Sequence, residues 1–306
     1  MRITPIAICL LLSLTALAQA QVREIGSVAH RPISEISGIV QSHTYPGTYW
    51  VHNDSGNSAS LFAINATAGV IFPPFLDEVK IGREEHPQNW QGVSVFVAAN
   101  QDWEDIAIAD GLIYLADMGN NGNARRDLGV YVIREPNPRA ITDARPLRYM
   151  PLEYPDQQRY PAKQWHFDCE SLFVDDGVLY FITKHRKPGK ISEWENGAKL
   201  YRMDTQHLDR VNQLTLVDSH ANIRAATGAD LSPDGQWQAV ISYQYIWLFK
   251  RPASGDQWLS GDSYKLALTK TGQVEAIAWQ DNDTLIFTNE PGQMFAVDKQ
   301  SILQNR

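Results

Sequence analysis

The chain has 306 residues, of which 43% are hydrophobic and 10% aromatic, and this is enough to bury a full core in one or two domains. Such a composition excludes a disordered or collagenous chain. Acidic residues number 35 against 27 basic ones, so the formal charge of −8 argues against a nucleic-acid-binding surface and is compatible with binding cations.

The first twenty residues have the pattern of a signal peptide. Arg2 is followed by an apolar run over 6–17 and by Ala18-Gln19-Ala20, the small-residue pattern that signal peptidase cleaves. We therefore expect residues 1–20 to be removed and residues 21–306 to form a single domain in the periplasm or outside the cell. The apolar run is shorter than the ~20 residues that span a bilayer, and no other stretch is long and apolar enough.

Cysteine usage is consistent with a fold that has no internal disulfide. Cleavage would remove Cys9 and leave Cys169 without an intramolecular partner. An exported domain without a disulfide must be stabilised by packing or by bound metal, and a large β core can provide the packing.

Five hairpin repeats follow, each with an acidic residue before its first strand. The clearest runs from Asp102 to Asn121, where apolar strands at 106–109 and 112–116 are joined by Asp110-Gly111, a strong signal for a tight turn. The other four hairpins begin at Glu35, Glu170, Asp230 and Glu275.

A third strand follows each hairpin, and a fourth follows most of them. The fifth repeat ends near the C-terminus without a fourth strand, whereas residues 22–29 form a strand with no hairpin partner nearby. Four-stranded antiparallel units repeated around an axis are the blades of a β-propeller, and the N-terminal strand would close the last blade. We predict an all-β propeller with five blades. Six blades are the alternative, with the extra blade in 69–101 or 135–163. Helix is expected only at 301–305 and at 205–211.

This topology predicts an acidic cluster on one face of the propeller. The start of a blade's first strand and the end of its second lie at the same edge, so the leading acids should gather near the axis. Five carboxylates without counter-charge would repel one another, so we expect either internal cations, a hard cation such as Ca²⁺, or a water-filled channel. Residues 117–122 resemble the start of an EF-hand loop, but Leu128 stands where that loop needs its bidentate Glu.

Several motifs also resemble a family of secreted bacterial β-propellers. They are Asp102-Trp103-Glu104-Asp105-Ile106-Ala107, the Tyr-x-x-Asp-x-Gly-x-Asn run at 114–121, Arg126 with 131–136, Tyr154-Pro155-Asp156, 168–172 and Thr183-Lys184. That family is distantly similar to calcium-dependent β-propeller phytases and lactonase-type propellers. The resemblance implies a propeller with an axial acidic site and, more weakly, hydrolysis. Asn120 and Asn121 stand where such proteins often have a second Asp in the turn.

Two functions are compatible with these residues. One is an exported propeller that binds a small molecule, glycan or partner protein at its axial face, with or without Ca²⁺. The other is metal-assisted hydrolysis of phosphate esters, esters or lactones. The candidate catalytic residues are Glu104, Asp105, Lys184 and Arg126. The candidate metal ligands are Glu35, Asp54, Glu104, Asp117, Glu170, Asp230 and Glu275. The sequence does not determine the oligomeric state.

Overall fold

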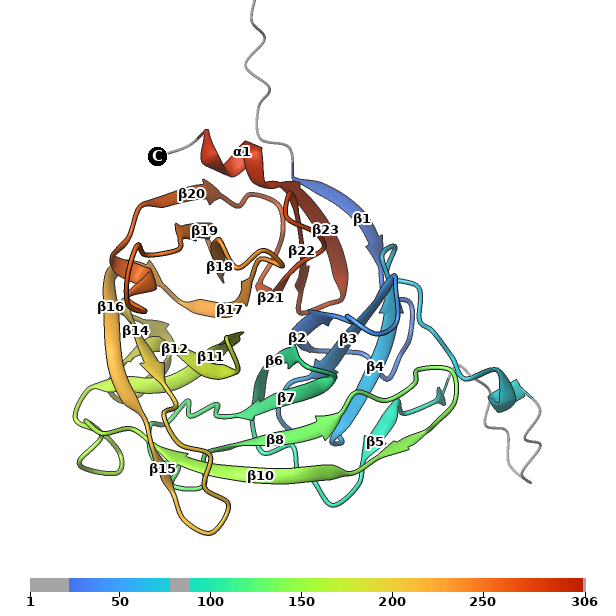
Figure 1. Cartoon of the computed structure of the whole chain (residues 1–306), viewed down its shortest axis with the longest axis horizontal. Coiled ribbons are helices and arrows are strands. Elements are labelled where there is room, and N and C mark those ends of the chain that lie inside the picture. Colours follow the sequence, from blue (N-terminus) through green and yellow to red (C-terminus); the bar gives the residue numbers. More distant parts are fainter. Residues whose placement is uncertain (1–21, 78–88, 305–306) are drawn as a thin grey trace, which may run out of the picture.

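Five β-sheets stand around a central axis in the computed structural model, which describes residues 22–77 and 89–304 (Figure 1). The predicted five-bladed propeller is therefore confirmed, and the six-bladed alternative is wrong. The expected signal peptide, residues 1–20, lies outside the described residues. Within the described part of the chain, no helix is long and apolar enough to cross a membrane.

Each blade begins with its innermost strand, and its later strands lie progressively further from the axis (Figure 1). The innermost strands of blades 1 to 5 are β2 (Ile36–Gln41), β6 (Trp103–Ala109), β11 (Trp165–Asp175), β17 (Ala226–Leu231) and β21 (Val274–Trp279). The second strands are β3 (Thr48–Asn53), β7 (Leu112–Asp117), β12 (Val178–Lys187), β18 (Trp237–Ser242) and β22 (Thr284–Asn289). The third strands are β4 (Ser60–Asn65), β8 (Gly129–Arg134), β14 (Asn196–Arg202), β19 (Tyr245–Lys250) and β23 (Gln293–Asp298). The outer strands of blades 1 to 4 are β5 (Val93–Val95), β10 (Pro146–Glu153), β16 (Thr215–Arg224) and β20 (Ser263–Ala267).

The N-terminal strand closes the ring, as predicted. β1 (Arg23–Ser27) pairs antiparallel with β23 and supplies the outer strand of blade 5. The first and last strands of the described chain therefore lie in one blade, and α1 (Lys299–Leu303), which follows β23, packs beside β20 of the neighbouring blade 4 (Figure 1). This pairing covers an edge that the fifth blade would otherwise expose.

The two segments that could have hidden a sixth blade instead extend blades 1 and 2. In the described part of 69–101, the 3₁₀ turn η1 (Pro74–Asp77) is followed by the outer strand β5. Two short strands cross between blades: β9 (Asp143–Ala144) pairs parallel with β5, and β15 (Asn212–Gln213) pairs parallel with β10. The helix expected at 205–211 is absent, because those residues form irregular chain before β15. The helical elements that the structure describes are short: η1, the 3₁₀ turn η3 (Trp258–Ser260) and α1.

The core lies between neighbouring blades, because successive residues of an inner strand face opposite sides. In β6, Ile106 and Ile108 pack with Trp50 toward blade 1, whereas Ala107 packs with Leu172 toward blade 3. The β6–β7 turn has positive φ at Asp110 (52°) and Gly111 (70°), as a tight primed turn requires. The Asp-Gly pair that predicted this hairpin therefore occupies the two turn positions that need positive φ.

Every innermost strand carries a β-bulge at the equivalent position. In β6, for example, Trp103 pairs with Asp117 and Asp105 with Ala116, so Glu104 is the extra residue. The five bulged residues are Ser37, Glu104, Glu170, Thr227 and Glu275. A bulge re-aims a side chain and often lies beside a functional site. The bulges therefore place polar side chains at one end of the five inner strands.

Candidate functional site

A cavity of about 270 Å³ lies at the bulged end of the inner strands. Its walls carry six carboxylates and two cationic side chains: Glu35, Asp54, Glu104, Glu170, Glu275 and Glu290, with Lys184 and Arg186. Three of the five bulged residues are among these carboxylates, and Ser37 is also part of the wall. The predicted gathering of acids from distant parts of the sequence therefore takes place for four leading acids of the hairpins.

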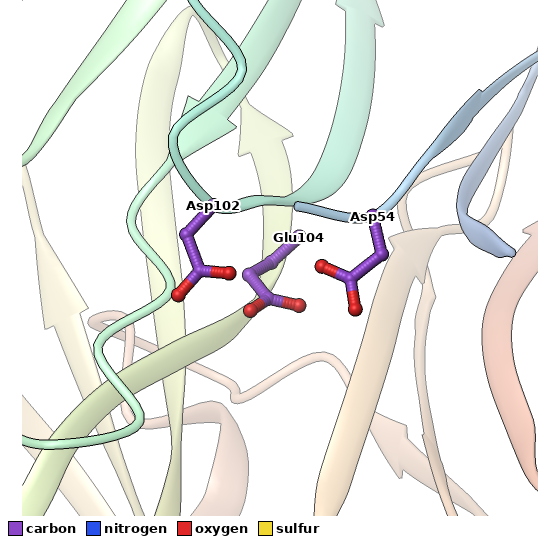
Figure 2. A group of neighbouring side chains, drawn as sticks. All are labelled: Asp54, Asp102 and Glu104. Atoms are coloured by element: carbon purple, nitrogen blue, oxygen red, sulfur yellow. The ribbon is translucent and has the colours of Figure 1, made fainter. Parts of the chain in front are cut away.

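Three carboxylates converge at this cavity: Asp54 and Glu104 line its wall, and Asp102 lies beside them. Asp54 follows the end of β3, Asp102 directly precedes β6, and Glu104 is the bulged residue of β6. One oxygen of each lies within 4.8 Å of an oxygen of the other two. Figure 2 shows Glu104 between Asp102 and Asp54, with the three carboxyl groups turned to the same side. We call these three residues the carboxylate trio.

No cationic side chain neutralises the carboxylate trio. Among the described residues, none of the three forms an ion pair with a Lys, Arg or His side chain. Glu104 is only 5% exposed, and Ser37 is the only hydrogen-bond donor to its carboxylate within the described chain, at 3.3 Å from Oε2. A buried carboxylate with one weak donor and four acidic neighbours, Asp54, Asp102, Asp168 and Glu170, is the kind of group that a bound cation would stabilise.

The surroundings favour the protonated form of all three carboxyls. Burial raises the pKa of Asp102 to about 6, and the nearby charges of Asp168 and Asp54 add to the shift. Burial also raises the pKa of Glu104 well above its usual value, with Glu170 as the strongest of its charged neighbours. The pKa of Asp54 is raised for the same first reason. Without a cation the trio therefore holds protons at pH values where exposed carboxylates are ionised.

A compact ion-pair network adjoins the trio, since oxygens of Asp168 and Glu170 lie within 4.8 Å of Glu104. The Lys184 Nζ lies 2.9 Å from Glu170 Oε1, and Arg186 bridges Glu170 at 3.0 Å and Asp168 at 2.5 Å. Burial opposes the charge on Lys184, but Glu170, Tyr243 and Glu275 outweigh it and raise the lysine pKa. Burial raises the pKa of Glu170 to about 8 in spite of Lys184. Asp168 and Glu170 thus have their cations, whereas the trio does not.

Gly119 makes room for the trio. A Cβ built on this glycine would lie 2.2 Å from Glu104 Oε1 and 2.5 Å from Asp102 Oδ2. The Gly119 amide also donates to the Asp102 carbonyl at 3.0 Å, and the Asn121 amide donates to Asp102 Oδ2 at 3.3 Å. The Asp-x-Gly-x-Asn run at the end of β7 therefore presses backbone against the two carboxylates, and a side chain at position 119 would push them out of place.

Asp105, a candidate catalytic residue, is instead part of the central packing. It is fully buried and outside the cavity wall. Its Oδ2 accepts the backbone amides of Leu172 in blade 3, at 2.7 Å, and Ala229 in blade 4, at 3.2 Å, and its Oδ1 accepts the amide of Ile106. Asp105 therefore joins three blades at the axis.

Three other candidates lie away from the cavity. Asp117 is paired with Arg125 at 3.0 Å and accepts the Asp102 amide at 3.1 Å. Arg126 is exposed and lies over the Tyr160 ring, 4.5 Å from its centroid. Asp230 lies at the opposite ends of the inner strands, on a second cavity of about 610 Å³, where it accepts the Trp279 amide at 2.8 Å.

The bulges explain why Glu35 and Asp230, which the sequence repeats align with Glu104, do not occupy the equivalent position in the structure. The positions equivalent to Glu104 are Ser37 in blade 1 and Thr227 in blade 4. Glu35 precedes its bulge by two residues and lies at the exposed rim, and Asp230 follows its bulge by three. Ser37 and Thr227 are matched in structure as well, since each hydroxyl donates at 3.0 Å to a carbonyl of the next blade, that of Glu104 and of Val274 respectively.

Sequence reasoning missed three residues of this site. Asp102 belongs to a motif that was recognised, yet only Glu104 and Asp105 were assigned roles. Asp168 opens the corresponding run before Glu170. Arg186 lies two residues after Lys184 on β12, so the alternation of a strand places both on one face and could have identified it.

No protein-family model matches the sequence, and a search of curated proteins finds no match. Several solved structures resemble the chain at low identity. The PQQ-bound aldose sugar dehydrogenase of Streptomyces coelicolor is 10% identical, with a TM-score of 0.48 over 92% of this chain and 98% of that one. A luciferin-regenerating enzyme is 11% identical, with a TM-score of 0.47 over 91% and 95%. A putative glucose dehydrogenase of Thermus thermophilus is 8% identical, with a TM-score of 0.44 over 91% and 99%. Likenesses of this degree carry no argument about activity.

Proposed function

We propose that this propeller binds a divalent cation at Asp54, Asp102 and Glu104, with Ca²⁺ as the first candidate, and that the cation holds a ligand at the axial face. The observation that carries the proposal is the convergence of three carboxylates with no cationic partner in the described chain. The resemblance to secreted propellers with an axial acidic site agrees with it. If residues 1–20 are a signal peptide, the ligand is met outside the cytoplasm, where free Ca²⁺ is abundant enough for a weak site.

The donor set suits a hard cation. All three side chains offer carboxylate oxygens, which Ca²⁺ and Mg²⁺ prefer, and the group includes no sulfur or imidazole. Ca²⁺ accepts six to eight oxygens in variable geometry, so three carboxylates, two of them at the wall of a cavity, would leave positions for water or a ligand. Mg²⁺ demands a stricter octahedron and fits such an irregular set less well.

Metal-assisted hydrolysis is the second candidate, because Lys184 and Arg186 share the cavity with Asp54 and Glu104 of the trio. Both cations are, however, already paired with Glu170 and Asp168. They are therefore less available to stabilise developing negative charge than free cations would be. Binding is the function that the geometry supports better.

Calorimetric titration of Ca²⁺ into the chelator-stripped protein at pH 8 tests the proposal. We expect one site per chain, and at least tenfold weaker binding in Glu104→Gln. Asp110→Asn is the matched control, because it removes the same charge at the exposed far end of the same hairpin and should bind as the wild type does. Equal affinity in Glu104→Gln, or no binding by the wild type, would overturn it. Turnover of p-nitrophenyl phosphate, simple esters or lactones that is lost in Glu104→Gln would establish the hydrolase instead.

A further inference from the structure

We infer that the ligand at the axial cavity is a neutral, hydroxyl-rich molecule of monosaccharide size and carries no phosphate or carboxylate group. This inference rests on the proposed cation site. It starts from the charges of the wall, where six carboxylates face two cationic side chains, both of them ion-paired. One divalent cation would leave this wall negative, so an anionic group would meet repulsion from several sides.

A cationic ligand is also disfavoured. It would compete with the metal for the trio, and it would approach Lys184 and Arg186 across a small cavity. Hydroxyl groups fit both partners, because their oxygens can coordinate a cation while their hydrogens are donated to carboxylates. Adjacent hydroxyls on one ring would fill two of the positions that the three protein ligands leave on Ca²⁺. The amides of Asn121 and Gln273 at the wall can donate to further hydroxyl oxygens.

One wall of the cavity offers an apolar surface for the ring carbons. It is built by β13 (Lys190–Trp194), an additional strand that pairs with β12 and contributes Ile191, Ser192 and Trp194 to the lining. The Trp194 ring stands edge to face against Tyr243, with centroids 5.2 Å apart and planes at 89°. Arg186 donates to the Ile191 carbonyl and so ties β13 to the ion-pair network.

This strand distinguishes blade 3 from the others. Within the described residues, no other blade has an additional strand in the link between its second and third strands. The cavity of about 270 Å³ lies at the small end of ligand pockets, which suits one sugar ring better than a larger molecule. Trp194 is therefore the specificity-determining residue that we assign.

The test uses the full chain loaded with Ca²⁺ and compares matched sugars by calorimetry. The probes are glucose, mannose, galactose and fucose, with glucose 6-phosphate and glucuronate as anionic counterparts. We expect at least one neutral sugar to bind, at least tenfold weaker binding of the anionic forms, and loss of sugar binding with chelator. Binding of none of the neutral sugars, or tighter binding of an anionic form, would overturn the inference.

Variants of the wall separate recognition from folding. Trp194→Ala should weaken sugar binding at least tenfold while leaving Ca²⁺ affinity within about twofold, and Trp194→Phe should restore most of the binding. Trp237→Ala, on blade 4 and outside the cavity wall, should change neither. Equal sugar affinity in Trp194→Ala would contradict the assignment. If Ca²⁺ itself fails to bind, the proposed function fails; if Ca²⁺ binds and the sugars do not, only the present inference fails.

Discussion

Replacing Glu104 by Gln should stabilise the cation-free protein above neutral pH, even though it alters a buried side chain. Oxygens of the trio lie within 4.8 Å of one another. At an effective dielectric constant of about 20, each pair of unit charges at that distance repels by about 3.5 kcal/mol. Three such pairs would cost roughly 10 kcal/mol, which is as large as the whole stability of a typical domain. The trio therefore retains protons in the absence of a cation.

The cost of a retained proton sets the size of the effect. The usual pKa of a glutamate is 4.5. Keeping Glu104 protonated in the folded protein lowers its stability by about 1.4 kcal/mol for each pH unit above that value, which is at most about 5 kcal/mol at pH 8. The neutral amide in Glu104→Gln needs no proton. We expect about half of this ceiling, roughly 2–3 kcal/mol, to appear as a higher free energy of unfolding, because water in the cavity screens part of the repulsion.

The sign of the pH dependence follows from the same protons. The unfolded chain releases them near the usual carboxyl pKa, whereas the folded trio and Glu170 hold them to higher pH, so the stability of the cation-free wild type falls as pH rises. Burial lowers the pKa of His52 to about 4 and of His185 to about 3, and these two groups reduce stability only as pH falls below about 6.5. The window from pH 6.5 to 8.5 therefore isolates the carboxylates.

Denaturant unfolding of chelator-treated protein at pH 6.5 and 8.5 measures this prediction. The wild type should lose stability over the interval, Glu104→Gln should lose less, and Asp110→Asn should follow the wild type. Saturating Ca²⁺ should remove the loss in the wild type alone. A wild type that is equally stable at both pH values, or a Glu104→Gln variant that is less stable than the wild type at pH 8.5 without cation, would refute the reasoning.

Three further outcomes are expected. Gly119→Ala should lower Ca²⁺ affinity at least tenfold in calorimetry, because its Cβ would displace Glu104 and Asp102; unchanged affinity would show that the trio tolerates the methyl group. Asp105→Ala should reduce the free energy of unfolding by about 3–9 kcal/mol, since three buried backbone amides lose their acceptor at about 1–3 kcal/mol each, and a loss below about 1 kcal/mol would argue against its role at the axis. Cys169 in a chain that begins at Gln21 should react with a thiol reagent only after unfolding, because burial raises its thiol pKa and closes access; rapid labelling of the native protein would contradict this.

The architecture could be predicted from the sequence because its signals are local and repeated. Apolar alternation, Asp-Gly turns and the unpaired strand at 22–29 indicate strands, hairpins and ring closure without knowledge of tertiary contacts. The cross-blade strands β9 and β15 could not be predicted, because they are two residues long and exist only through pairing with another blade. The additional strand β13 was missed for a similar reason, since Lys190–Trp194 has no clear alternation of its own.

The site was harder to predict than the fold, because it depends on register. A bulge adds one residue to a strand and changes which side chain faces the axis, and it leaves no mark in the sequence. Glu104, Glu170 and Glu275 line the cavity, as predicted, because each is the bulged residue of its strand. Asp230 was aligned with them, but the bulged residue of its strand is Thr227, three residues earlier, and Asp230 lies at the second cavity. Arg125 pairs with Asp117, while its neighbour Arg126, which was the candidate, faces outward.

Locating a bound ion tests the central claim most directly. Crystals grown from chelator-stripped protein and soaked with Ca²⁺, or with a lanthanide that gives a strong anomalous signal, should show one peak within about 2.3–2.6 Å of oxygens from Asp54, Asp102 and Glu104. The same soak of Glu104→Gln crystals should show no peak there. A fully occupied peak elsewhere, with none at these three carboxylates in the wild type, would contradict the account.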